Sequence, residues 1–344
     1  MTDVSKYTRQ TVTEVRSWVP GKLFSLRVTR DPAFVFKAGQ FARVGLPGTA
    51  LPGAAAGNPA ASDATAAPDA PGTSAASPTG AASATADAAP TLWRAYSMVS
   101  GPLEDALEFF SIVVPEGEFS PRLARLREGD SLYIEKNPYG FLTIDRFFPT
   151  QAAPAGQDID ATGAAPTASE ATPSGGTTPA MSAMLAAPDL TRTQPDLWLL
   201  ATGTGLSAYL SILRDPATWT SFRRIIVVHG VRHAEELAYR EEIESWSSLP
   251  EFAAIHRADP RKLIYLAIAT REALPGMPSE RLTTLIADGR LEQLAGERLD
   301  PKLAKVMLCG NPAMLSAARK LLGEMGFAPG RRGIPGNLAV ENYW

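Results

Sequence analysis

The sequence predicts a two-domain protein in which an antiparallel β-barrel precedes a doubly wound α/β domain with a parallel sheet. Two observations support this prediction. Short segments that alternate apolar and polar residues fill the N-terminal part, whereas apolar strands alternate with helical segments after residue 195. A length of 344 residues is also typical of two domains.

The N-terminal part has the pattern of strands separated by turns. Alternation of apolar and polar residues indicates a strand with one buried face. On this basis and from apolar content we expect strands within residues 11–18, 23–30, 40–46, 91–100, 107–114 and 131–136. Residues 137–141 are expected to close the barrel, although any antiparallel barrel would satisfy this pattern.

Two segments differ sharply from the rest in composition. Residues 48–90 and 150–195 are rich in Ala, Pro, Gly, Ser and Thr, and the first contains no Lys, Arg or aromatic residue. Such segments cannot bury enough apolar surface to offset the entropy of ordering. We expect them to be disordered insertions, with a partner-recruiting linker as the alternative. The predicted domains are therefore 1–149 for the barrel and 196–344 for the α/β domain.

The composition excludes several classes of protein. A net charge of −3 and a pI near 5.8 predict neither a nucleic-acid nor a membrane partner. One cysteine, Cys309, excludes an intramolecular disulfide framework and fits a reducing cytosol. The three histidines show no metal-ligand spacing with carboxylates, so we expect no metal site. Without a leader-like or membrane-spanning apolar run, we expect a cytoplasmic protein, and a monomer.

The stretch Arg94-Ala95-Tyr96-Ser97 has the chemistry of a flavin dinucleotide site. Alternate strand residues share a face, so Arg94 and Tyr96 can contact one ligand. A guanidinium binds a pyrophosphate, an aromatic ring stacks on a heterocycle, and Ser97 can donate a hydrogen bond to a ring edge. An ordinary strand that happens to carry an Arg and a Tyr is the alternative for this stretch alone.

A second phosphate site is predicted at the start of a short helix. Ser120 is expected as its N-cap and Pro121 as its first residue, with Leu123 on the buried face. A helix N-terminus presents free N–H groups suited to a phosphate. A capped helix with no ligand is the alternative.

The α/β domain begins with a strand, a glycine turn and a helix over residues 196–213. Residues 203–208 match the pattern G-x-G-x-x-A, which in this context favours binding of a dinucleotide pyrophosphate over a purely structural turn. The next strand ends at Arg232, with no acidic residue before Glu235. Because an arginine there suits a 2′-phosphate, and Arg271 and Arg281 add two more cations, NADP(H) is favoured over NAD(H). Surface arginines without a ligand are the alternative.

Taken together, these motifs resemble the bacterial ferredoxin/flavodoxin–NADP reductases. The resemblance covers nearly everything outside the two insertions. It rests on five motifs in order, namely Arg94-Ala95-Tyr96-Ser97, Gly117-x-x-Ser120-Pro121-Arg122-Leu123, Ala201-Thr202-Gly203-Thr204-Gly205, Cys309-Gly310-Asn311-Pro312 and Glu341-Asn342-Tyr343-Trp344. It implies an FAD-binding barrel followed by an NADP(H)-binding α/β domain.

The resemblance also implies roles for individual residues. For FAD, Arg94 would bind the pyrophosphate, Tyr96 would stack on one flavin face, and the turn Gly117–Ser120, which includes Phe119, would take phosphates. Ser97 would lie near flavin N5, Tyr343 would cover the other face, and Trp344 would lie toward the adenine. For NADP(H), the implied residues are Thr202, Gly203, Thr204 and Gly205 at the pyrophosphate and nicotinamide, and Arg232, Arg271 and Arg281 at the 2′-phosphate and adenine. Cys309 would face the nicotinamide, or simply fill the core as a small hydrophobe. The implied catalytic residues are Ser97, Cys309, Glu341 and Tyr343.

The activity implied by the resemblance is hydride transfer from NADPH to the flavin, followed by single-electron transfer to ferredoxin or flavodoxin. The alternatives are a reductase that serves an oxygenase or free flavin, and a flavin-binding redox sensor. A fused iron–sulfur domain, which many oxygenase reductases carry, is excluded by the single cysteine.

Overall fold

The computed structural model describes residues 6–47, 89–148, 194–250, 252–331 and 334–342. Nearly all of the two predicted insertions lies outside these ranges, but their last residues fold with the neighbouring domains. The fourth strand begins at Pro90. The carbonyl of Pro195 accepts a hydrogen bond from the Arg223 N–H at 2.9 Å, and the Gln194 side chain donates one to Thr220 at 2.7 Å.

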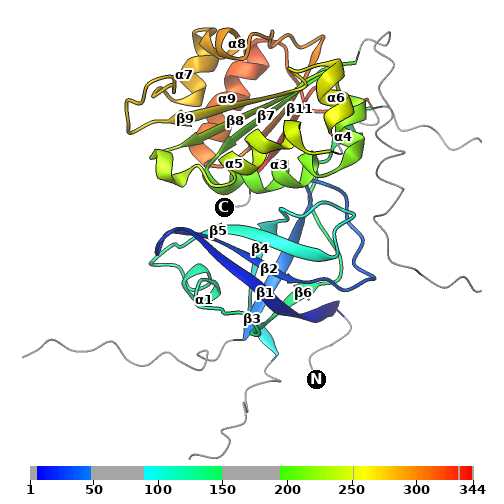
Figure 1. Cartoon of the computed structure of the whole chain (residues 1–344), viewed down its shortest axis with the longest axis vertical. Coiled ribbons are helices and arrows are strands. Elements are labelled where there is room, and N and C mark those ends of the chain that lie inside the picture. The colour runs from blue at the N-terminus through cyan, green and yellow to red at the C-terminus, as the bar shows by residue number, and fades with distance from the viewer. Residues whose placement is uncertain (1–5, 48–88, 149–193, 251, 332–333, 343–344) are drawn as a thin grey trace, which may run out of the picture.

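The first half of the chain is a six-stranded antiparallel sheet in the order β4-β3-β6-β1-β2-β5 (Figure 1). Its strands are β1 (Tyr7–Val19), β2 (Leu23–Thr29), β3 (Phe41–Pro47), β4 (Pro90–Ser97), β5 (Ala106–Ile112) and β6 (Ser131–Glu135). The two outer strands meet at an antiparallel bridge between Met98 and Phe109, which closes the sheet into a barrel. Residues 137–141, expected to close it, instead contribute a bridge between Tyr139 and Phe41 of β3. The helix α1 (Ser120–Leu123) follows β5, and a 3₁₀ turn, η2 (Ile144–Phe147), follows β6.

The second half is a five-stranded parallel sheet in the order β11-β10-β7-β8-β9. Its strands are β7 (Asp196–Thr202), β8 (Ile225–Val231), β9 (Leu263–Ala269), β10 (Ala304–Cys309) and β11 (Leu338–Glu341). All of β8, and all of β7 except Thr202, is buried, as expected for a parallel sheet covered on both faces. This arrangement confirms the predicted fold class.

Helices cover both faces of the parallel sheet. The helices are α3 (Leu206–Leu213), α4 (Pro216–Ser221), α5 (Arg240–Ser245), α6 (Ala253–Ala258), α7 (Leu282–Ala287), α8 (Arg290–Ala295) and α9 (Pro312–Glu324). Alternate residues of β7 point to opposite faces: Leu199 belongs to the core under α3 to α6, and Trp198 to the core under α7 to α9. The short 3₁₀ turns are η3 (Gly203–Gly205), η4 (Ala234–Glu236) and η5 (Trp246–Ser248).

The barrel packs against the α3 side of the parallel sheet, and the two domains share one apolar core. Val19, Leu23 and Phe110 of the barrel belong to the same cluster of buried residues as α3 and β7. The ring of Tyr239, just before α5, lies 4.4 Å from that of Trp18 and 5.3 Å from that of Phe110. Burying this apolar surface between the domains fixes their relative position.

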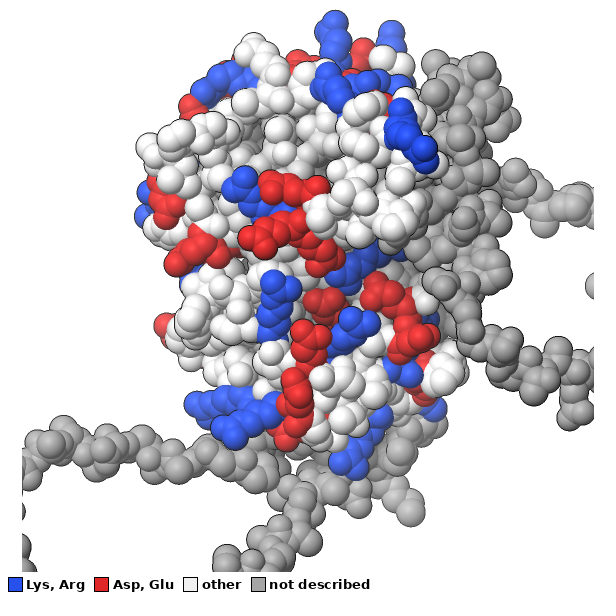
Figure 2. All heavy atoms as spheres, viewed as in Figure 1, with Lys and Arg blue, Asp and Glu red and all other residues white. Residues whose placement is uncertain are grey.

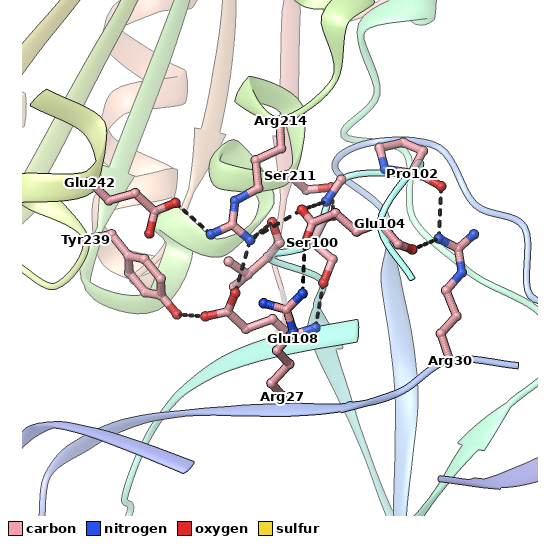
Figure 3. A network of polar contacts seen from close by, with 12 residues as sticks. Arg27, Arg30, Ser100, Pro102, Glu104, Glu108, Ser211, Arg214, Tyr239 and Glu242 are labelled. Carbon is pink, nitrogen blue, oxygen red and sulfur yellow. Dashed lines mark hydrogen bonds and ion pairs between the residues drawn. The ribbon is translucent and has the colours of Figure 1, made fainter. Parts of the chain in front are cut away.

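Tyr239 also belongs to a network of charged and polar groups at the domain boundary (Figure 3). Arg214, at the end of α3, donates to Glu108 of β5 at 3.0 Å and to Glu242 of α5 at 2.7 Å. The hydroxyl of Tyr239 donates to the other oxygen of Glu108 at 2.6 Å. Burial alone would lower the pKa of Arg214, but Glu242, Glu108 and Glu104 raise it above its ordinary value. Figure 2 shows acidic and basic side chains intermixed along the seam between the domains.

Across the described residues, none of the helices has the length and apolar character needed to span a membrane.

Candidate active site

The carboxyl ends of β7 and β10 form the centre of the candidate site. The chain runs from β7 outward to β8 and β9, and then returns to place β10 on the other side of β7. Ligands of open α/β sheets bind at such a switch point. Thr202 ends β7, and its Oγ1 accepts a hydrogen bond of 2.9 Å from the Asn311 N–H beyond β10. A cavity of about 770 Å³ opens beside these residues, within the size range of cofactor sites.

The predicted glycine turn lies at this point because only glycine fits there. Gly203 has a φ of +56°, in the left-handed region. A Cβ on Gly205 would lie 2.5 Å from the Cys309 carbonyl oxygen, and one on Gly310 would lie 2.2 Å from Thr202 Oγ1. The first turn of α3, which follows directly, contains no acidic residue. The N-terminus of this eight-residue helix is therefore free of a competing negative charge.

All three predicted arginines line the same 770 Å³ cavity as the glycine turn. The pairing of β8 with β9 continues past the strand ends, since the Arg271 N–H donates to the Arg232 carbonyl at 2.9 Å. Arg281 lies directly before α7. Among the described residues, none forms an ion pair or hydrogen bond with the guanidinium groups of Arg232, Arg271 or Arg281.

The acidic residues around this cavity are already paired. Glu272 accepts hydrogen bonds from the Ala234 N–H at 3.0 Å and from His233 at 2.9 Å. Glu280 pairs with Arg290. The arginines thus leave a net positive surface that suits an anionic ligand.

No sequence pattern indicates Lys22 and Glu236 as site residues, although both line this cavity. They form an ion pair across the domain boundary. Glu236 also accepts the Arg232 N–H at 3.0 Å. Burial raises the pKa of Glu236, but these partners outweigh it and hold the pKa below its ordinary value. Because 214 residues separate the two, no local pattern indicates the pair.

A second cavity of about 320 Å³ lies next to the first, between the barrel and the glycine turn. The two cavities share Phe110, Ile112 and Thr204. The predicted residues that line the second cavity are Arg94, Tyr96, Ser97, Gly117, Phe119, Ser120, Thr204, Gly205 and Cys309. Residues from both domains therefore meet around two contiguous spaces.

The barrel side of the second cavity is formed by β4, β5 and the turn before α1. The half-buried ring of Tyr96 packs 5.8 Å from that of Phe119, and its hydroxyl accepts a hydrogen bond of 3.4 Å from Ser111. Burial raises the pKa of the Tyr96 hydroxyl. Ser97 is buried, whereas Arg94 is exposed and donates to the Trp93 carbonyl at 2.8 Å.

The prediction that Ser120 caps the helix is wrong. Phe119 is the N-cap of α1, and no side chain caps it. The Ser120 hydroxyl instead accepts a hydrogen bond from the Val114 N–H at 2.8 Å and so closes the turn of residues 114–120. The N–H of Val114 has left the β5 ladder and needs an acceptor, and the serine supplies it. At four residues, α1 is also too short to contribute a sizeable helix dipole.

Cys309 and Glu341 are brought side by side by the pairing of β10 with β11. Glu341 also accepts a hydrogen bond of 2.9 Å from the Phe141 N–H of the barrel domain. Burial, together with the charge of Glu341, raises the pKa of the Cys309 thiol to about 12, so the thiol stays protonated at neutral pH. The remaining predicted site residues, Tyr343 and Trp344, lie outside the described residues.

An antiparallel barrel joined to a doubly wound domain, with contiguous cavities at their boundary, defines a two-domain nucleotide-binding architecture. The sequence model of the oxidoreductase NAD-binding domain family matches residues 199–320. The ferredoxin–NADP reductase A of Sorangium cellulosum is 32% identical over 98% of this chain and 90% of its own length. The ferredoxin–NADP reductase of Pseudomonas aeruginosa is 30% identical over 93% of this chain and 91% of its own.

Solved structures show the same fold. A ferredoxin NADP⁺ reductase from Neisseria gonorrhoeae, solved with bound FAD and NADP, aligns with a TM-score of 0.67 at 24% identity, covering 98% of this chain and 99% of that one. The chain belongs to the ferredoxin/flavodoxin–NADP reductases, a family of oxidoreductase enzymes.

Proposed function

We propose that the protein is an FAD-containing reductase that oxidises NADPH and passes electrons singly to a ferredoxin or flavodoxin. FAD would occupy the 320 Å³ cavity and NADP(H) the 770 Å³ cavity. The observation that supports this most is the contiguity of the two spaces. One has an aromatic and cationic barrel wall, and the other has a glycine turn and three arginines whose guanidinium groups have no partner among the described residues.

The residues of the smaller cavity fit a flavin dinucleotide. Tyr96 offers a half-buried ring for stacking, supported from behind by Phe119. Arg94 supplies a cation for the pyrophosphate, and the turn closed by Ser120 supplies backbone donors. Ser97, buried at the end of β4, would donate its hydroxyl proton to the polar edge of the flavin ring.

The residues of the larger cavity fit NADP(H) better than NAD(H). Gly203 lines this cavity and Gly205 lies at its border with the smaller one, so a pyrophosphate could approach the backbone of the turn closely. Arg232, Arg271 and Arg281 would bind the additional 2′-phosphate. The two acidic residues that line this cavity, Glu236 and Glu280, are both held in ion pairs. An NAD-specific site would instead favour an acid at the end of β8.

When both cofactors are bound, reduced nicotinamide supplies a hydride and the flavin supplies the conversion from two-electron to one-electron transfer. The protein contributes orientation and exclusion of water. Phe110 and Ile112 line the shared wall with apolar surface. Cys309 keeps its proton on Sγ, so at the boundary of the smaller cavity it would offer the nicotinamide a small, uncharged contact rather than a nucleophile. Glu341 ties β11 to the barrel through the Phe141 N–H.

The choice of ferredoxin or flavodoxin as acceptor rests on the names of the relatives and on the chemistry of a one-electron step. The single cysteine fits a reducing compartment, so a cytosolic location is part of the proposal. We keep the predicted roles of Tyr343 and Trp344 at the flavin as part of the same proposal.

Purified protein tests the proposal in two stages. We expect one non-covalent FAD per chain and oxidation of NADPH with ferricyanide as acceptor. The host's ferredoxins and flavodoxins are then supplied one at a time in place of ferricyanide. Reduction of free flavin in preference to every carrier protein would favour the flavin-reductase alternative. Bound flavin without turnover would favour a redox sensor.

A further inference from the structure

His229 is an unusual residue for its position. It lies in β8, a strand buried along its whole length, and its side chain is 0% exposed. An imidazole in such a place loses its hydration, so it destabilises the fold unless its nitrogens find partners. The proposed roles of the cavity residues do not account for it, since it is not among the residues that line either cavity.

Both ring nitrogens of His229 have a partner. Nε2 lies 3.1 Å from the carbonyl oxygen of Gly203, and Nδ1 lies 3.3 Å from the hydroxyl of Tyr265. A carbonyl can only accept, so the proton of the neutral ring belongs on Nε2, and Nδ1 accepts from the Tyr265 hydroxyl. Burial supports the neutral form, because it lowers the pKa of His229 to about 4.

The glycine turn depends on this hydrogen bond more than on packing at its first residue. Gly205 is held by close contact with Cys309, and the Thr204 carbonyl is held by the Ser207 hydroxyl at 2.8 Å. Gly203 lacks such a packing contact, since a Cβ there would meet none of the described residues within 4 Å. Its carbonyl accepts from Leu206 within the same turn and from His229, which ties the turn to the next strand.

We propose that His229, oriented by Tyr265, is a positioning residue for the nicotinamide-nucleotide half of NADP(H). By holding the Gly203 carbonyl toward the sheet, it keeps the backbone N–H groups of the turn available for the pyrophosphate. The inference rests on the proposed NADP(H) site. In this proposal His229 affects NADP(H) binding through the glycine turn and does not itself contact the ligand.

The layout of the cavity allows an experiment that distinguishes positioning of the turn by His229 from a general structural role of this residue. Arg232 and Arg271 follow β8 and β9, and Arg281 lies directly before α7, whereas the turn follows β7. In the proposed site, a 2′-AMP fragment would reach the arginines only, whereas NADP⁺ would also extend to the turn. Loss of the His229 contact should therefore weaken NADP⁺ and leave 2′-AMP unchanged.

The experiment is a titration of the FAD-loaded protein and its variants with NADP⁺ and with 2′-AMP. We expect His229→Leu to raise the Kd for NADP⁺ about five- to tenfold, as for loss of one neutral hydrogen bond, with the Kd for 2′-AMP within about twofold of wild type. His229→Gln, whose amide can donate near the Nε2 position, should restore most of the NADP⁺ affinity. His229→Asn, whose shorter side chain cannot reach Gly203, should not.

Equal weakening of both ligands in His229→Leu would overturn the proposal and assign His229 a general structural role. Unchanged affinity for both would overturn it too. If His229→Leu does not fold with FAD, the comparison of Gln with Asn decides, and equal NADP⁺ affinity in these two variants would contradict the proposal. A wild-type protein that binds neither ligand would instead refute the proposed NADP(H) site.

Discussion

At the scale of single residues, a charged side chain without an ion-pair partner indicates a ligand site more clearly than the mere presence of a charged residue. The acids beside the larger cavity are paired with His233, Arg290 and Lys22, whereas the three arginine side chains have no partner in the part of the chain that the structure describes. Ion pairs at a surface contribute little to stability. The three clustered arginines, by contrast, repel one another unless a bound anion neutralises their charge. This residual charge supports a preference for the 2′-phosphate.

Replacing Arg232 or Arg281 with Ala should therefore change nucleotide preference. Loss of one charge-assisted contact, about 1.5–3 kcal/mol, corresponds to roughly a tenfold or larger fall in kcat/KM for NADPH. The kinetics with NADH should hardly change. Arg319→Ala, an exposed arginine on α9, is the matched control and should change neither. Equal losses with both nucleotides would show that the arginines support the fold rather than read the phosphate.

His229 also makes stability depend on pH. Its pKa is 6.5 in the unfolded chain and about 4 in the fold, so the unfolded chain binds the extra proton first as pH falls. The free energy of unfolding should decrease between about pH 6.5 and pH 4, by on the order of 3 kcal/mol. His229→Gln should remove this part of the acid sensitivity. Parallel pH profiles of urea midpoints for wild type and variant would contradict this account.

At the scale of elements, local patterns predicted the glycine turn and the strands, while contacts between distant segments could not be predicted. The spacing of Gly203 and Gly205 between an apolar strand and helix is a local signal. Ser120 was assigned to the wrong hydrogen bond because a hydroxyl can cap a helix or close a turn equally well. The Lys22–Glu236 pair joins segments far apart in the chain, for which one sequence contains no signal.

The glycine turn should tolerate no side chain at its third residue. Gly205→Ala would place a Cβ against the backbone of Cys309, where neither partner can move easily. We expect destabilisation of about 1–3 kcal/mol and weaker binding of NADP⁺. Gly323→Ala is the control, because it lies in α9 with nothing near its Cβ position. It should stabilise by about 0.5–1 kcal/mol. Thermal unfolding of both variants distinguishes them, and a neutral Gly205→Ala would mean that the turn is loosely packed.

At the scale of the whole molecule, the sequence predicted two domains but not the contacts that fix one against the other. The strand patterns and the five motifs define each domain separately. Arg214, Glu108 and Tyr239 meet only when both domains are folded (Figure 3). Tyr239 also has a φ of +61°, which a non-glycine residue adopts only where its surroundings hold it. The two cavities depend on this boundary, since each has walls from both domains.

Arg214→Leu should consequently be among the more damaging substitutions away from the cavities. It leaves Glu108 and Glu242 without their cation and with Glu104 nearby. Removal of one partner from this partly buried charge cluster should cost up to about 3–5 kcal/mol. Arg240→Leu, which breaks an exposed pair with Glu244, should cost less than about 1 kcal/mol. Urea unfolding followed by flavin fluorescence compares the two. Similar midpoints for both variants would show that the network does not hold the domains together.

The central claim is that the two contiguous cavities hold FAD and NADP(H) close enough for hydride transfer. Rapid anaerobic mixing tests it most directly. The FAD-loaded protein is mixed with NADPH, and separately with NADH, while flavin absorbance is followed. The account predicts loss of the oxidised flavin band within a single turnover with NADPH, and a rate at least about tenfold lower with NADH, as expected from the charge-assisted contacts to the 2′-phosphate. A protein whose bound FAD stays oxidised in excess NADPH, or is reduced equally fast by NADH, would contradict it.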